Sequence, residues 1–408
     1  MLNNKPRWAL VLVLVLATAL ISSALTYSYT RSLYNPRNEY VLYFNKDELT
    51  KSDVAKFSEV WNLLKENFYY DIDEREMFEG AIAGLAAGLK DPYTIYYTKE
   101  QMKQLREYSS SSYVGVGLIV SETKDGILEV IEAVGGGPAK AAGIKEGDLI
   151  VKVNGDDVTE EEADFVVNLI KGEEGTEVVV TVYRPSEFQY LDFKMVRKKV
   201  HIPSVKSEII DNLIGYIRIT MFDTMVAMDF YNELNLLLKK GIKGLIIDVR
   251  DNPGGSYDQV VSIADMFLPE AIILYTEDKD GNREYERSNA AHIDIPLVVL
   301  VNERSASASE VLAGAFQDNG RATIVGTQTY GKGVVQAIIP TKDGSGLRVT
   351  IAGYYTPKGN VVQDVGITPD HKVEIQGTYK DSPISSIPRQ EDLQFHAAVE
   401  IMKGKLAP

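Results

Sequence analysis

Two short segments of the chain carry residue types that could together break an acyl bond. Ser305–Glu310 (Ser-Ala-Ser-Ala-Ser-Glu) places serine hydroxyls where an apolar run, 296–301, gives way to a helical pattern. Gly331–Gln336 places Lys332 between two glycines and ends on a glutamine. A serine needs a base to become a nucleophile, and an uncharged lysine can be that base. The two segments predict nucleophilic catalysis without histidine.

The serine segment has two interpretations. Ser307 would stand at the start of a helix, where backbone N–H groups carry partial positive charge and that of Ala308 could hold an oxyanion. Ser307 and Glu310 also have the spacing of a capping box, in which the serine only closes the helix end. Taken alone, the pattern favours the cap, and it does not decide which of the three serines would react.

A lysine base must be largely neutral. Its usual pKa of about 10.4 leaves only about one molecule in a few thousand uncharged at pH 7, and burial can lower that pKa by about 3–5 units. Gly331 and Gly333 would let backbone pack closely around Lys332. Gln336 is expected on the same strand face as Lys332, where a neutral amide can bind the amine without favouring its charged form. Taken alone, a lysine between glycines is typical of an exposed loop.

A third segment, 248–255 (Asp-Val-Arg-Asp-Asn-Pro-Gly-Gly), follows the apolar run 244–249. Ligands of layered α/β folds gather at the carboxyl ends of strands. The N–H of Gly254 could therefore be a second oxyanion donor, and one such donor is worth about 10²–10³ in rate. The local alternative is a simple turn with Asn-Pro-Gly-Gly chemistry.

These segments lie in a region where strand and helix patterns alternate. Apolar runs at 214–219, 244–249 and 296–301 predict strands, the last two buried on both faces. Helices are expected at 225–238, 260–267 and 309–317. The alternation predicts an α/β layered core.

Two other regions precede this core. Residues 46–107 have the helical spacing of apolar residues and are expected to form a helical cap or dimerisation arm. Residues 113–199 are rich in strand patterns, with short helices at 138–143 and 163–170, and their order resembles a PDZ domain. Such domains bind a peptide C-terminus as an added strand. The expected peptide-binding loop is Gly115, Val116, Gly117 and Leu118.

Several separated motifs together resemble the carboxyl-terminal processing proteases, over residues 48–400 or so. The motifs are 89–93, 248–255, 305–310, 317–322, 331–336 and 366–370. The resemblance implies a crotonase-like protease core behind a PDZ domain that recognises substrate C-termini and gates the site. It implies that Ser307 is the nucleophile, Lys332 the general base and Gln336 the residue that orients the lysine. It also implies Ala308 and Gly254 as the oxyanion donors.

One position departs from that family. Lys171 stands in the PDZ-like region where many members have arginine, and lysine keeps the charge but not the planar fork. Lys171 is still expected to contact the bound peptide.

Composition limits the remaining possibilities. The 408 residues are 45% hydrophobic and 25% charged, which predicts two or three globular domains. The net charge of -15 argues against nucleic-acid binding. The absence of cysteine excludes disulfides and thiolate nucleophiles, and the four histidines lack a metal-binding spacing. We expect no metal and no cofactor.

The N-terminus predicts export. Lys5 and Arg7 precede an apolar run at 8–25 that is long enough to span a bilayer. We expect residues 1–7 in the cytoplasm, a transmembrane signal anchor at 8–27 and an extracytoplasmic catalytic part. The alternative is a signal peptide cleaved at Ser22-Ser23-Ala24, which would release a secreted protein.

The expected domains after the anchor are 46–107 (helical arm), 113–199 (PDZ), 200–380 (Ser/Lys protease core) and 381–408 (C-terminal helical segment). The expected function is a membrane-anchored serine endopeptidase that works through an acyl-enzyme. Its expected partners are protein or peptide substrates with accessible C-termini, the membrane and a second copy of the chain. Two alternatives remain: a PDZ scaffold that binds peptides without cutting them, and a crotonase-type acyl transferase, for which no coenzyme A phosphate site is evident.

Overall fold

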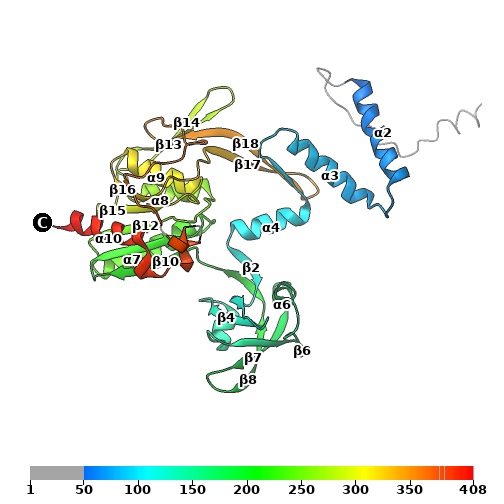
Figure 1. The fold of residues 1–408 in the computed structure, drawn as a ribbon, viewed down its shortest axis with the longest axis horizontal. Helices are drawn as coiled ribbons and strands as arrows, with labels where there is room; N and C mark the ends of the chain where they lie inside the picture. Colours follow the sequence, from blue (N-terminus) through cyan, green and yellow to red (C-terminus); the bar gives the residue numbers. More distant parts are fainter. Residues whose placement is uncertain (1–49, 376, 381, 408) are drawn as a thin grey trace, which may run out of the picture. The chain divides into compact units, whose positions relative to one another are not determined.

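The computed structural model describes residues 50–375, 377–380 and 382–407, and the chain divides into two units, Met1–Met77 and Phe78–Pro408. In the first unit, α2 spans Lys51–Asn67 (Figure 1). Its N-cap is Thr50, whose hydroxyl accepts a hydrogen bond from the N–H of Asp53. No residue of α2 is buried. The next helix, α3 (Glu74–Ala87), begins in the first unit and ends in the second.

The PDZ-like region is a small β-rich fold with its own apolar core. Its sheet has the strand order β3-β4-β5-β7-β8, with β6 beside β5, and a separate ribbon pairs β2 with β9. The strands are β2 (Ser112–Gly115), β3 (Leu118–Glu122), β4 (Leu128–Ala133), β5 (Leu149–Val153), β6 (Asp156–Asp157), β7 (Glu177–Arg184), β8 (Gln189–Val196) and β9 (Lys198–His201). Its helices are α5 (Pro138–Ala142) and α6 (Ala163–Ile170). Alternating inward residues such as Val178, Val180 and Val182 fill the interior.

The catalytic segments emerge from a six-stranded sheet of order β10-β11-β12-β15-β16-β19, parallel except for β10. Its strands are β10 (Val205–Ile210), β11 (Ile214–Ile219), β12 (Gly244–Asp248), β15 (Leu297–Val301), β16 (Ala322–Gly326) and β19 (His371–Lys372). Every residue of β12 and β15 is buried, as expected for parallel strands covered on both faces.

Helices cover the two faces of this sheet (Figure 1). On one face, an apolar core joins α7 (Val226–Lys239), α8 (Tyr257–Asp265) and α9 (Ala308–Asp318) to the sheet. On the other face, α10 (Leu393–Leu406) packs through residues such as Phe395 and Met402. Three short 3₁₀ helices lie before α10: η1 (Gly377–Tyr379), η2 (Ile384–Ser386) and η3 (Arg389–Glu391).

A second sheet, not expected from the sequence, stands beside this layered core. Its order is β1-β18-β13-β14, and β17 pairs with β18 off that path. Its strands are β1 (Ile95–Tyr97), β13 (Ile272–Asp278), β14 (Arg283–Arg287), β17 (Val334–Pro340) and β18 (Gly346–Tyr355). Because β1 lies between α3 and α4 (Lys99–Ser109), the region 46–107 is not wholly helical and contributes a strand to the core.

Candidate active site

The structure separates Ser307 from the two serines beside it. Ser305 and Ser309 are fully buried, and their hydroxyls donate to backbone carbonyls, Ser305 to Val249 at 2.8 Å and Ser309 to Asn252 at 2.9 Å. Ser307 is half-buried and lines an open cleft. The tertiary contacts therefore leave the middle serine in position to meet a substrate.

Ser307 occupies a sharp turn between β15 and α9. Its φ of 53° lies in the left-handed region, which a residue with a side chain seldom adopts. Such a conformation costs on the order of 1–3 kcal/mol and must be held in place by its surroundings. The N–H of Glu310 donates to the Ser307 carbonyl at 2.8 Å, so this helix amide has a backbone acceptor.

The buried carboxylate of Glu310 joins the serine segment to the lysine segment. One oxygen, Oε2, accepts from the N–H of Ser307 at 2.8 Å and from that of Lys332 at 2.9 Å. The other, Oε1, accepts from the Thr329 hydroxyl at 2.6 Å and the Gly331 N–H at 2.7 Å. The Glu310 carboxylate thus takes part in the expected capping box, and it also fixes the backbone of Lys332.

Tyr354 of β18 makes a second link between these segments. Its hydroxyl donates to the carbonyl of Lys332 at 2.6 Å and lies 3.1 Å from the carbonyl of Ser307. Burial raises the pKa of Tyr354 well above its usual value, so the hydroxyl keeps the proton that it donates. Sequence reasoning missed Tyr354, because nothing in its local pattern distinguishes it from any strand tyrosine.

Lys332 lies two residues before β17, in surroundings that disfavour its positive charge. Burial lowers the pKa of Lys332, and the positive charge of Arg348 lowers it further, while Asp91 and Glu310 oppose the shift. Its Nζ lies 4.8 Å from the centre of the Tyr93 ring. Tyr93 belongs to the motif 89–93, so the region before the PDZ-like fold reaches the lysine. A Cβ on Gly333 would stand 2.2 Å from the N of Gln363, which confirms the expected close backbone packing.

The position of Gln336 differs from the strand alternation expected for it. Lys332 precedes β17 rather than belonging to it, and a register shift lies between Val335 and Gln336. The prediction of one shared strand face does not hold as made, because Lys332 lies outside β17; the extra residue of the register shift, Ile351, is in β18. Gln336 still lines the same cleft as Lys332, and its amide donates to the Val334 carbonyl at 3.2 Å.

The two expected oxyanion donors lie next to each other. A Cβ on Gly254 would stand 2.8 Å from the Ser307 Cβ and 3.0 Å from the Ala308 N, and its φ of 102° suits glycine. The N–H of Gly254, however, donates to the Asn252 side chain at 2.9 Å. Gly254 thus touches the serine turn while its N–H is held by an asparagine.

These residues line one cleft of about 500 Å³, to which α4 also contributes through Leu105 and Tyr108. Much of its wall is apolar, from Leu105, Met221, Val260, Val311, Val335 and Ile338. Across the part of the chain that is described, no group of three or more acidic or histidine side chains is placed to hold a metal ion.

The expected peptide-binding residues surround Tyr113. Gly115 ends β2, Leu118 begins β3, and the Nζ of Lys171 lies 5.4 Å from the centre of the Tyr113 ring. The Leu118 N–H donates to the Tyr113 hydroxyl at 3.0 Å. Of the other two, Val116 is fully buried and Gly117 has a φ of 80°. The Tyr113 hydroxyl therefore accepts a hydrogen bond from a backbone amide that, by the resemblance, would bind the carboxylate of a peptide.

The similarity to known proteins extends over most of the chain. Residues 213–373 match the model of peptidase family S41, residues 130–184 match a PDZ domain, and residues 19–101 match the activating protease CtpB N-terminal domain. Carboxy-terminal processing protease CtpA of Bacillus subtilis is 34% identical over 364 residues, covering 89% of this chain and 76% of the relative. A probable CtpA-like serine protease of Staphylococcus aureus is 35% identical, covering 90% of this chain and 73% of the relative.

A solved structure agrees at the level of the fold. The putative S41 protease from Bacteroides fragilis superposes with a TM-score of 0.52 and 16% identity, covering 90% of this chain and all of that chain. The chain belongs to the carboxy-terminal processing protease family and is a serine-type peptidase with a PDZ domain and peptide substrates.

Proposed function

We propose that Ser307 and Lys332 form the catalytic pair and that this protease works through an acyl-enzyme. The observation that carries the proposal is the Glu310 carboxylate, which binds the backbone N–H of both residues at the edge of one cleft. Because one carboxylate binds both backbones, it fixes the position of Ser307 relative to Lys332, although the two residues lie in separate segments of the sequence. The lowered pKa of Lys332 supports a base that loses its proton more readily than an exposed lysine.

The proposed reaction has two halves. Neutral Lys332 takes the Ser307 proton as Oγ bonds to the substrate carbonyl carbon, and the resulting ammonium gives that proton to the departing amine as the peptide C–N bond breaks. Water then attacks the ester with Lys332 again as base, and Ser307 leaves reprotonated. The N–H groups of Ala308 and Gly254 stabilise the oxyanion in both halves. The Gly254 N–H must first leave Asn252.

Gln336 is proposed to orient Lys332. Its amide binds the Val334 carbonyl at 3.2 Å, a weak contact next to the lysine segment. A side-chain rotation would exchange this contact for one to the lysine amine.

Substrate recognition is proposed to begin at the PDZ domain. Gly115, Val116, Gly117 and Leu118 would receive the C-terminal carboxylate, with Lys171 beside them. The Tyr113 hydroxyl must release the Leu118 N–H for this to happen. We therefore propose flexible or unfolded substrates, with apolar residues that fit the apolar wall of the cleft.

We further propose that the protease is anchored in the membrane with its catalytic part outside the cytoplasm. The segment 8–27 lies outside the described residues. Within 50–407, leaving out 376 and 381, no helix is long and apolar enough to cross a bilayer. Cell fractionation of the full chain against a variant lacking 1–27 tests the anchor, and a soluble full chain would contradict it.

We also propose that the protease pairs with a second copy through α2. Within the described part of the first unit, α2 exposes Phe57, Val60 and Leu64 at helical spacing.

The decisive experiment is cleavage of an unfolded protein by the full chain and its Ser307→Ala variant. We expect kcat to fall by a factor on the order of 10⁴ or more, because no other group replaces the nucleophile. Ser305→Ala is the matched control for the loss of a neighbouring hydroxyl. Equal cleavage by Ser307→Ala and the parent would sink the assignment, and intact peptide bound by both would favour the scaffold alternative.

A further inference from the structure

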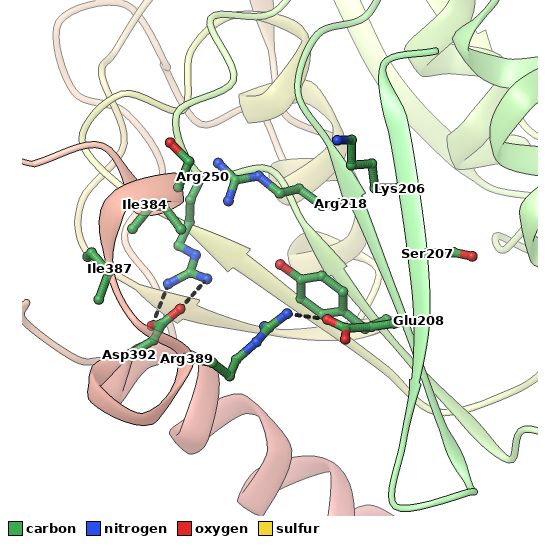
Figure 2. A pocket seen from close by; sticks show the side chains of 11 residues that line it. Lys206, Ser207, Glu208, Arg218, Arg250, Ile384, Ile387, Arg389 and Asp392 are labelled. Atoms are coloured by element: carbon green, nitrogen blue, oxygen red, sulfur yellow. Dashed lines mark hydrogen bonds and ion pairs between the residues drawn. The ribbon is translucent and has the colours of Figure 1, made fainter. Parts of the chain in front are cut away.

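A second cavity, of about 350 Å³, shares no lining residue with the Ser307 cleft. It lies between the strands β10 and β11 on one side and the segment 384–392 on the other (Figure 2). Tyr216, which lines it, also packs with α10, so the cavity opens on the face of the core sheet that α10 covers. The established peptidase chemistry gives it no role.

The acidic side chains of this cavity already hold arginines. Asp392 accepts two hydrogen bonds of 2.8 Å from the guanidinium of Arg250, and Glu208 pairs with Arg389. The dashed lines in Figure 2 mark both pairs. Arg250 is fully buried and also binds Asp248. These acids are therefore matched by positive charges within the cavity wall.

Two positive charges of the lining each form one long ion pair. Lys206 and Arg218 are directly opposite each other in the antiparallel register of β10 and β11. The Lys206 Nζ lies 3.8 Å from Glu132, and the Arg218 Nη2 lies 3.9 Å from Asp251. Both distances exceed a hydrogen bond. Like charges directly opposite on neighbouring strands destabilise a sheet, so an anion placed between them would relieve the repulsion.

The carboxylate of Asp251, which pairs with Arg218 at 3.9 Å, is shared with other donors. Its Oδ1 accepts from the Asn302 side chain at 2.8 Å, and its Oδ2 accepts from the Ile384 N–H at 2.6 Å. The Arg218 side chain is only 18% exposed, yet its guanidinium offers five donors in a planar fork that suits a carboxylate.

Part of the cavity lining is apolar. Ile384 and Ile387 line it, and Tyr216 adds an aromatic ring. Figure 2 shows both isoleucines and Arg218 around the same space. A ligand that fills the cavity would therefore carry its charge at one end and an aliphatic group at the other.

We propose that this cavity is a second binding site, for a carboxylate carried on a small apolar group. A peptide C-terminus that ends in an aliphatic residue has this chemistry, and so does a free aliphatic acid. Arg218 and Lys206 bind the carboxylate, and the aliphatic group packs against Ile384 and Ile387. The site is independent of the Ser307 reaction and of the PDZ loop.

The test is isothermal titration of the full chain at pH 7 and constant ionic strength. The probes are N-acetyl-leucine, its uncharged match N-acetyl-leucinamide, and 4-methylpentanoate. We expect the acids to bind at least about tenfold more tightly than the amide, because a charge-assisted hydrogen bond contributes about 1.5–3 kcal/mol. If N-acetyl-leucine binds more tightly than 4-methylpentanoate, the ligand of the cavity is a peptide C-terminus. If the two bind equally, the ligand is an aliphatic acid. Both results support the site.

Single substitutions show whether the acid binds in this cavity. Arg218→Gln and Lys206→Gln should each weaken the binding of N-acetyl-leucine to the cavity about tenfold, whereas Lys171→Gln, at the end of α6 in the PDZ domain, should leave that binding unchanged. Lys206 is 75% exposed, so its substitution tests the site without endangering the fold. Both cavity variants should keep parental peptidase activity. Unchanged affinity in both cavity variants, or equal affinity for the acid and the amide, overturns the proposal, whatever the fate of the Ser307 assignment.

Discussion

Lys332 must lose a proton before it can act, and its neighbours decide at which pH this happens. Burial and the charge of Arg348 lower its pKa, so peptidase activity should rise with pH through a value below that of a free lysine. The Tyr93 ring near Nζ acts in the opposite sense, because a cation over an aromatic face is stabilised. The pKa of Lys332 therefore reflects a balance between these contacts.

Arg348→Gln should move the acidic limb of the pH profile of kcat/KM to higher pH. Removing the neighbouring positive charge makes the protonated form of Lys332 less unfavourable, so its pKa rises and less base is present at neutral pH. Activity lost at pH 7 should return at higher pH. Arg348→Lys keeps the charge and is the control. A uniform loss at every pH would show that Arg348 acts through structure alone.

At the scale of elements, the N-terminus of α9 and the approach to β17 depend on one another. Glu310 is fully buried and accepts four hydrogen bonds, three from backbone N–H groups. A buried carboxylate with this many donors fixes a loop more firmly than apolar contact, because every donor that loses its acceptor carries a desolvation cost.

Glu310→Gln should therefore reduce both stability and kcat. The amide nitrogen cannot accept, so at least one oxygen position loses its two donors, at about 1–3 kcal/mol for each donor left unpartnered. Urea unfolding measures the stability, and steady-state peptidase assays measure kcat. Glu303→Gln, an exposed position that accepts only from Thr327, is the control. Parental kcat in Glu310→Gln would refute its role in positioning the pair.

At the scale of the second unit, a buried ion pair ties the C-terminal segment to the core. Arg250 follows β12 and is bound by Asp248 on one side and by Asp392, just before α10, on the other. Burial raises the pKa of Asp248, but the Arg250 charge outweighs it, and the net shift is downward. The same segment leads through Asn252 to Gly254, so the tie also supports the oxyanion loop.

Asp392→Ala should destabilise the second unit by about 3–5 kcal/mol, because it leaves part of the Arg250 charge buried without a partner. Asp392 also caps α10 by accepting from the Phe395 N–H at 2.9 Å. Asp392→Asn separates these roles, since asparagine can still cap a helix but carries no charge. Urea unfolding of both variants, with the exposed Glu400→Ala as control, measures the cost. Parental stability in Asp392→Asn would contradict the importance of the charge.

In the first unit, the exposed apolar stripe of α2 predicts that Leu64→Glu disrupts a dimer. Leu64 is 48% exposed within this unit, and a charge there could not be buried against a second copy. Sedimentation of the full chain in detergent should show the parent as a dimer and the variant shifted towards monomer. Ser58→Glu, on the same helix, adds the same charge without removing apolar surface. A monomeric parent would rule out this interface.

Local sequence patterns predicted the elements that position the site. The helix at 163–170, the strand at 214–219 and the buried strands at 244–249 and 296–301 agree with the structure to within a residue. The spacing of apolar residues in the helix and the continuous apolar runs of the two buried strands are both visible in consecutive residues. The second sheet was missed because β13 and β18, which are adjacent in space, are separated in sequence by β14, β15, α9, β16 and β17.

The sequence by itself determined the residue types of the site and the family resemblance, because both depend only on identity and order along the chain. Only the tertiary structure decided how those residues are used. It buries the hydroxyls of Ser305 and Ser309 and leaves Ser307 facing the cleft. It brings Tyr93 and Tyr354 to Lys332, and it begins β17 only at Val334, after Lys332. These outcomes depend on contacts between distant segments, and no local pattern encodes such contacts.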